Sequence, residues 1–276
     1  MERIVTSDGL RDHVFTVGTR SGHELTVQAG AGAGGAGAGP MELMLVSLAA
    51  CAQSTLIDVV EKMRQPIEAL HVSAWGSRAE KVPRIWNRVQ LVFVVRSGGA
   101  PDRLERAVEL AERSCSAAAM VAKAAVLTSM LIQVARVDAA LTRPLRQRIL
   151  RPHQTIEELM VPGEEGIEAA WFAAMLGDEV VGTAGVFPEP SPDLETAPAW
   201  RLRAMATDEG IRGMGVGEML LDACLTHAEA HGAALVWCSA RTPVRGFYED
   251  RGFVSVSDVY EPEALGPHIR MARSIG

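Results

Sequence analysis

The segment Ile211 to Gly217, IRGMGVG, has the residue types and spacing of an anion-binding turn. Arg212, Gly215 and Gly217 fit the pattern RxxGxG, and glycine permits the backbone conformations in which consecutive N–H groups converge on one phosphate. The amphipathic segment 218–232 predicts a helix, and the N-terminus of a helix attracts negative charge. A diphosphate is therefore the expected ligand. Because this pattern is also common in ordinary loops, the neighbouring segments must show whether the turn binds an anion.

The neighbours of this turn form an ordered series of elements. WRLRAMAT (200–207) alternates like a strand before the turn, and AALVWCSA (233–240) reads as an apolar strand after the helix. RTPVRGFYEDRGF (241–253) then predicts a short helix that brings Tyr248 close to the end of that strand.

A strand, a glycine-rich turn, a helix, a strand and a tyrosine helix in this order resemble the GNAT family of acetyl-CoA-dependent N-acetyltransferases. The resemblance covers about residues 144–276 and implies an α/β GNAT fold with a mixed, mostly antiparallel sheet. Three further segments resemble one subgroup of that family: LRQRILRP (145–152), WCSAR (237–241) and GPHIRM (266–271).

This resemblance implies acetyl-CoA as cosubstrate and an amine, on a small molecule or a peptide, as acceptor. The pantetheine arm is expected beside Met205, Ala206 and Thr207. The pyrophosphate is expected on the turn, at Arg212, Gly213, Met214, Gly215, Val216 and Gly217. Tyr248 is expected to protonate the departing thiolate as general acid, while backbone N–H groups stabilise the oxyanion. The general base stays open: it acts through a water, or it is one of Glu249, Asp250, Glu261 and His268.

Two cysteines in the first half carry a second chemistry. Cys51 ends GPMELMLVSLAAC (39–51), and Cys115 lies 64 positions later in ERSCS (112–116). A cysteine on an apolar helix is usually a small core residue, so the interpretation depends on the two motifs together. These motifs resemble the OsmC family, which includes organic hydroperoxide reductases. The resemblance covers about residues 1–137 and implies an α+β domain with a buried central helix.

In that resemblance Cys51 is the peroxidatic thiol, which an organic hydroperoxide oxidises to a sulfenic acid. Cys115 then resolves it as a disulfide, and a thiol reductant restores both groups. A thiolate needs positive charge nearby. Arg20 is expected to supply it and Glu42 to hold the Arg20 guanidinium, with Arg11 as the alternative arginine.

Composition limits the remaining classes of function. The chain has 276 residues, 48% of them apolar, and a net charge of −7, which favours two globular domains and disfavours nucleic acid as partner. Its four cysteines lack CxxC spacing, and His227 with His231 lacks a third ligand, so no metal is expected. The N-terminus has no signal-peptide pattern and no run of about eighteen uncharged apolar residues is present. We therefore expect a cytoplasmic protein without a membrane segment.

Hydrophobic periodicity predicts the elements of the first half. VFTVGT and HELTVQA form an expected hairpin, followed by a glycine-alanine tract (29–39) that should be a mobile loop. The apolar residues of 40–65 continue almost round the circumference of a helix that Pro40 opens, so this helix should be buried. Two strands, two helices and a last strand are expected at 71–80, 87–97, 102–114, 116–125 and 126–137.

We predict a fusion of an OsmC-like domain (1–137), a short linker (138–143) and a GNAT domain (144–276). OsmC-like proteins form intertwined dimers, so a homodimer through the first domain is expected. The expected activities are acetyl transfer in the second domain and thiol-dependent peroxide reduction in the first. The alternative is an acetyltransferase whose first domain is only a dimerisation or ligand-sensing module. The acidic residues of the proline-rich loop 186–198 are expected in solvent, although they could attract a cationic amine: Glu189, Asp193 and Glu195.

Overall fold

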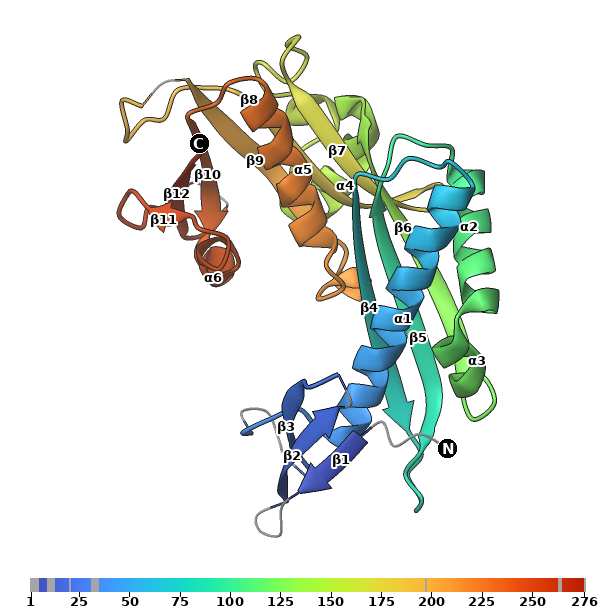
Figure 1. Cartoon of the computed structure of the whole chain (residues 1–276). Helices are drawn as coiled ribbons and strands as arrows, with labels where there is room; N and C mark the ends of the chain where they lie inside the picture. The colour runs from blue at the N-terminus through green and yellow to red at the C-terminus, as the bar shows by residue number, and fades with distance from the viewer. Residues whose placement is uncertain are drawn as a thin grey trace. The chain divides into compact units, whose positions relative to one another are not determined.

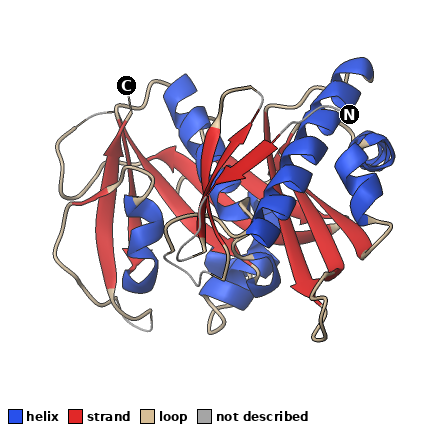
Figure 2. Ribbon diagram, turned by 60° about the horizontal axis from the view of Figure 1, so that its bottom comes forward, coloured by secondary structure: helices blue, strands red, loops and turns tan. Residues whose placement is uncertain are grey.

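The computed structural model of the chain describes residues 5–8, 13–19, 21–30, 35–196, 198–262 and 265–275 (Figures 1 and 2). The chain divides into two compact units. Unit 1 comprises Met1–Val59, Val72–Leu91 and Ala107–Ser129. Unit 2 comprises Val60–His71, Val92–Arg106 and Met130–Gly276.

Unit 1 contains a three-stranded antiparallel sheet of β1 (Val5–Asp8), β2 (Val14–Thr19) and β3 (Glu24–Gln28). The expected hairpin is confirmed, because β2 and β3 pair from Val14↔Gln28 to Gly18↔Glu24. Gly22 has φ 85° in the connecting turn, a conformation that glycine adopts at low cost. The described end of the glycine-alanine tract is tied to β3 by a hydrogen bond from Gln28 N to Ala38 O of 3.2 Å.

Helix α1 (Pro40–Lys62) buries one stripe of side chains in the single chain. Leu48, Ala52 and Leu56 lie four residues apart, and each is about 1% exposed, as expected for one face of a helix. Elsewhere on the helix Met44 is 50% and Val46 54% exposed. The helix that was expected to be buried is therefore buried along this stripe and exposed elsewhere, because its apolar circumference exceeds the surface that covers it within one chain.

By length and composition alone, α1 is also apolar enough to cross a membrane, with a mean hydropathy of 1.8. Its uncharged stretch covers only residues 43–57, between Glu42 and Asp58, so the helix does not contain the run of about eighteen uncharged residues that was expected to be absent. Core helices of water-soluble proteins can have the same length and composition.

The remaining elements of the first half match the predicted pattern. They are β4 (Ala69–Arg78), β5 (Trp86–Arg96), α2 (Pro101–Ser114), α3 (Ser116–Val121) and β6 (Val126–Val137). In α2 the buried residues Ala107 and Ala111 repeat with helical spacing, and Cys115 caps the N-terminus of α3.

In unit 2 the strands of the sheet follow the order β11-β12-β10-β9-β8-β7-β6. Its later strands are β7 (Ala170–Leu176), β8 (Glu179–Pro188), β9 (Ala199–Thr207), β10 (Leu235–Arg241), β11 (Val254–Ser255) and β12 (His268–Ser274). From β6 to β11 all neighbouring strands are antiparallel except β9 and β10, which are parallel. The expected mixed, mostly antiparallel sheet is confirmed.

Two helices pack against opposite faces of this sheet. Helix α5 (Val216–Ala230), orange in Figure 1, packs along β7, β8 and β9, and α4 (Ala139–Leu150) contacts the same strands. Phe172 joins the core beneath α5, whereas its neighbour Trp171 clusters with Ala139 of α4. Adjacent residues of a strand point to opposite faces, so the two helices sandwich the sheet.

Short helical segments connect these elements: η1 (Glu157–Leu159), η2 (Glu209–Ile211), η3 (Thr242–Val244) and α6 (Arg245–Glu249). The segment expected as a linker, 138–143, consists of Asp138 at the N-cap of α4 and the first residues of that helix. The placement of the domain boundary there stays a prediction.

Candidate active site

The central feature of unit 2 is the point where β9 and β10 stop pairing. The parallel pairing runs from Leu235↔Ala199 to Cys238↔Leu202 and ends there. Ala204 has φ 52°, and the pairing of β9 with β8 shifts register at this position, which marks a β-bulge. Arg203, Ala206 and Thr207 pair with β8 on either side of this bulge, but no pairing of residues 203–207 with β10 is present. The backbone edge of β9 is therefore available on the side that faces β10.

Met205, Ala206 and Thr207 lie on this unpaired edge. Backbone N–H and C=O groups along such an edge can pair with an extended ligand as a neighbouring strand would. The three residues expected beside pantetheine thus lie on an unpaired strand edge, and their role stays a prediction.

The glycine-rich turn joins η2 to α5. Gly213 and Gly215 have φ 77° and 83°, and Gly215 is the N-cap of α5 without a side-chain cap. The N–H groups of Arg212 and Met214 close the turn onto Glu209 O and Ile211 O at 3.3 and 3.4 Å.

The N–H groups of Gly213, Gly215, Val216 and Gly217 have no backbone acceptor among the described residues. The first turn of any helix leaves such donors free. These four groups, rather than all six expected positions, can therefore supply the hydrogen bonds to a pyrophosphate.

Steric limits explain the glycines of the turn. A Cβ on Gly215 would overlap the ring of His71, and its positive φ also disfavours a side chain. A Cβ on Gly217 would lie 3.5 Å from the Phe247 ring and 3.8 Å from Met205 Cε, which is ordinary contact. Gly215 is the position where glycine is required.

Tyr248 lies on α6 and is 6% exposed. Its ring packs edge-on against Phe247 and Phe253, with centroids 5.1 and 5.5 Å away. Burial is the main cause that raises the pKa of Tyr248 well above its usual range, and the Cys238 and Cys224 thiols add to it. The phenol therefore stays protonated at neutral pH and can act as a proton donor.

The candidates for the general base occupy different environments. Glu249 forms an ion pair with Arg245 at 2.6 Å, and Asp250 and Glu261 are exposed. His268 is buried, with Nδ1 2.8 Å from Gly266 O. The assignment stays open.

In unit 1 the structure brings Cys51 and Cys115 together. The Cys115 thiol donates a hydrogen bond to Cys51 Sγ over 3.2 Å, and both thiols are free. The backbone N–H of Ala117, then the Cys115 thiol, lowers the pKa of Cys51. Burial raises the pKa of Cys115. Cys51 is thus the more acidic thiol and Cys115 its hydrogen-bond donor.

The positive charge expected beside Cys51 belongs to residues outside the described part of the chain. Arg20 and Arg11 belong to the residues that the structure does not describe. Glu42 accepts a hydrogen bond from Gly39 N at 3.2 Å. The expected pairing of Glu42 with the Arg20 guanidinium stays a prediction, because Arg20 lies outside the described residues. The donors at Cys51 come instead from the start of α3, which the motif ERSCS could have indicated.

The acidic loop before β9 differs from its expected state. Glu189 pairs with Arg201 at 2.5 Å and with Arg203 at 3.2 Å. Asp193 accepts two hydrogen bonds from Arg270, at 2.5 and 2.8 Å. The expectation of solvated carboxylates is therefore wrong for both residues, because arginines of the sheet neutralise them.

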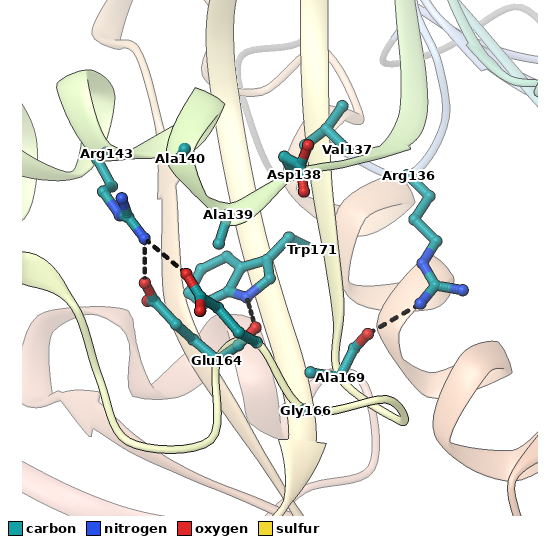
Figure 3. A pocket seen from close by; sticks show the side chains of 11 residues that line it. Arg136, Val137, Asp138, Ala139, Ala140, Arg143, Glu164, Gly166, Ala169 and Trp171 are labelled. Carbon is teal, nitrogen blue, oxygen red and sulfur yellow. Dashed lines mark hydrogen bonds and ion pairs between the residues drawn. The ribbon is translucent and has the colours of Figure 1, made fainter.

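A cavity of about 610 Å³ lies at the N-terminal end of α4 (Figure 3). Two of its arginines are engaged within the protein: Arg143 pairs with Glu164 at 2.6 Å, and Arg136 donates to Ala169 O. Neither Tyr248 nor the glycine-rich turn lines it. Within the described part of the chain, no group of three His, Cys, Asp or Glu residues could hold a metal ion.

Parallel strands that separate beside a glycine-rich helix start and a buried tyrosine define a CoA-dependent acyltransferase fold, here fused to a dithiol domain. Residues 142–253 match the acetyltransferase (GNAT) family, and residues 32–130 match the OsmC-like protein family. The chain therefore belongs to both families and joins an OsmC-like domain to a GNAT domain.

Relatives cover the two halves separately. The uncharacterized N-acetyltransferase YitI of Bacillus subtilis is 32% identical over 146 residues, which are 52% of this chain and 97% of the relative. Protein YhfA of Escherichia coli is 31% identical over 110 residues, 39% of this chain and 81% of the relative. The crystal structure of Escherichia coli ElaA is 26% identical, covers 49% of this chain and 88% of that protein, and has a TM-score of 0.37.

The sequence analysis assigned no role to one group of residues, the arginines near the separated ends of β9 and β10. Arg151 and Arg241 belong to motifs that carried the resemblance, yet neither was given a role. For Arg241 the sequence held a positional signal, since this arginine directly follows the predicted strand 233–240.

Proposed function

We propose that the GNAT domain transfers the acetyl group of acetyl-CoA to an amine. The observation that carries this proposal is the free backbone edge at Met205 to Thr207, which follows the separation of β9 from β10 and leads to the free N–H groups of the turn. An extended thioester with a diphosphate needs both features, in this order along the chain.

The residues would act as follows. The N–H groups of Gly213 and Gly215 to Gly217 bind the pyrophosphate, and the edge of β9 aligns the pantetheine arm. The amine lone pair forms a bond to the thioester carbonyl carbon, the C–S bond breaks, and the thiolate takes the proton of Tyr248. The amine loses its proton to a base or to a water.

The test is release of the CoA thiol from acetyl-CoA in the presence of a panel of primary amines. Tyr248→Phe should retain acetyl-CoA binding and lose most turnover. An absence of amine-dependent thiol release with every amine would contradict the proposal.

A second activity, thiol-dependent reduction of organic hydroperoxides, is favoured by the 3.2 Å separation of Cys51 and Cys115 and by the lowered pKa of Cys51. The Cys51 thiolate would attack a peroxide oxygen, and the alcohol would leave with a proton. The Cys115 thiol would then displace water from the sulfenic acid and form a disulfide, which an external dithiol reduces. Arg20 as the source of positive charge is part of this proposal.

The alternative is that the OsmC-like domain only mediates dimerisation or senses a ligand. The exposed apolar side chains of α1, such as Met44 and Val46, fit a surface that a second copy covers. Sedimentation of the wild-type chain tests the dimer. Peroxide treatment separates the two roles, because a peroxidase forms the Cys51–Cys115 disulfide and a scaffold does not. A cytoplasmic location remains part of the proposal.

A further inference from the structure

The separated ends of β9 and β10 carry arginines on the face of the sheet covered by α4. Leu202 and Ala240 belong to the core beneath α5. Because neighbouring residues of a strand point to opposite faces, Arg203 and Arg241 point to the other side. They flank the gap in which the thioester is expected.

Arg241 meets Arg151 at the C-terminus of α4. Arg151 Nη1 and Arg241 Nη2 donate to the same atom, Leu150 O, at 2.9 and 3.2 Å. Both guanidinium groups are half-buried. Among the described residues, neither has a carboxylate within ion-pair distance.

The nearby carboxylate is already paired with other arginines. Arg201 and Arg203 share one carboxylate, that of Glu189, and Nε of Arg203 is buried without a partner. Burial, then the charges of Arg241, Arg146 and Arg203, lowers the pKa of Arg151. Like charges held this close in a half-buried site favour binding of an anion.

We propose that Arg151 and Arg241 bind a carboxylate of the acetyl acceptor, so that the substrate is an amino acid or another amine that carries a carboxylate near its amino group. This inference rests on the acetyltransferase function proposed above. The planar guanidinium fork matches a carboxylate bidentately. A carboxylate held at the end of α4 directs the amine toward the gap between β9 and β10.

The paired carboxylates of the adjoining loop agree with this choice. Glu189 and Asp193 are neutralised by arginines, so neither is free to select a cationic acceptor without an anionic group. Among the described residues, the guanidinium groups of Arg151 and Arg241 near the gap have no carboxylate partner, and they select for negative charge.

The test compares the standard amino acids with their amides and with phosphoethanolamine as acceptors, by CoA thiol release. We expect turnover with at least one amino acid, and a KM at least about tenfold higher for its amide, because a charge-assisted hydrogen bond is lost. Equal KM values for the two forms, or turnover confined to amines without an anionic group, would overturn the inference. A preference for phosphoethanolamine over every amino acid would overturn the carboxylate assignment.

Variants test the residues directly. Arg241→Gln and Arg151→Gln should each raise the KM for the accepted amino acid about 10- to 100-fold and leave the acetyl-CoA dissociation constant unchanged. Arg241→Lys, which keeps the charge but not the fork, should be intermediate. Arg148→Gln is the matched control on α4, since its exposed guanidinium has its own partner, Asp208.

The two proposals fail in different ways. If wild-type protein does not bind acetyl-CoA, the acetyltransferase function fails and this inference fails with it. If acetyl-CoA binds and amines turn over, but the variants keep the wild-type KM, only the assignment of Arg151 and Arg241 is overturned.

Discussion

Cys115 donates a hydrogen bond to Cys51 across 3.2 Å, and the start of α3 supplies backbone N–H groups to the same sulfur. The two thiols therefore differ in acidity although they are neighbours. The hydrogen bonds to Cys51 stabilise its thiolate, whereas burial penalises a charge on Cys115.

This difference predicts the pH dependence of alkylation. A lowered pKa means that the Cys51 thiolate persists to lower pH, so reaction of Cys51 with iodoacetamide should continue at pH values where Cys115 is unreactive. Peptide mass spectrometry after short exposures at a series of pH values measures both rates. Faster labelling of Cys115 than of Cys51 at neutral pH would contradict the assignment.

Replacement of Cys51 by serine should abolish disulfide formation by an organic hydroperoxide, because the attacking sulfur is lost. Intact-mass measurement should show loss of two hydrogens from the wild type and no change in the variant. Cys224→Ser is the control, since burial raises the pKa of the Cys224 thiol and keeps it inert. A wild-type chain that keeps both thiols under excess peroxide would leave only the scaffold role for this domain.

Tyr248→Phe should lower kcat roughly 100-fold, the usual contribution of a general acid. The phenol has a raised pKa because it is buried, so the wild-type rate should show no loss from Tyr248 ionisation between pH 7 and 9. Steady-state kinetics between pH 7 and 9 measures kcat for the wild type and the variant. The unfolding midpoint of the variant is the folding control. An unchanged kcat would remove Tyr248 from the mechanism.

Glu164→Gln should destabilise the protein by about 3–5 kcal/mol, because it leaves a buried guanidinium without its counter-ion. The Glu164 side chain is 2% and that of Arg146 5% exposed, with 3.3 Å between the charged atoms. The control is Glu165→Gln, whose side chain is 74% exposed and 3.8 Å from Arg143, and which should change stability by less than about 0.5 kcal/mol. Urea unfolding measures both; equal effects would show that the buried pair is not specially stabilising.

Gly215→Ala tests the turn apart from any ligand. It should cost about 1 kcal/mol or more, since alanine must adopt φ 83° and its Cβ would overlap His71. Gly177→Ala is the matched control, because Gly177 also has a positive φ, 57°, but nothing lies within 4 Å of the added atom. Urea unfolding should show the larger loss for Gly215→Ala. A smaller loss there than in Gly177→Ala would mean that the turn has room for a side chain.

Local patterns in the sequence predicted most of the fold. The alternation of β2 and β3 and the glycine at Gly22 gave the hairpin, and the order of strand, turn and helix at 200–232 gave β9 and α5. These features depend on neighbours in the chain, which a single sequence displays.

The parts that could not be predicted depend on distant residues. The contact of Arg151 with Arg241 joins the end of a helix to the end of a strand 90 positions later, and it exists only because both surround Leu150 O. The exposed side of α1 could not be predicted for the same reason. Apolar residues all round a helix show which side chains can be buried, but not which distant residues cover them.

The most direct test of the central claim is calorimetric titration of acetyl-CoA into the wild-type protein and into Gly215→Glu, with Gly177→Ala as the folded control. The account predicts saturable binding to the wild type and to Gly177→Ala. It predicts loss of binding in Gly215→Glu, where bulk and negative charge enter the turn at the expected pyrophosphate position. Absence of binding to the folded wild type, or equal binding to Gly215→Glu, would contradict it.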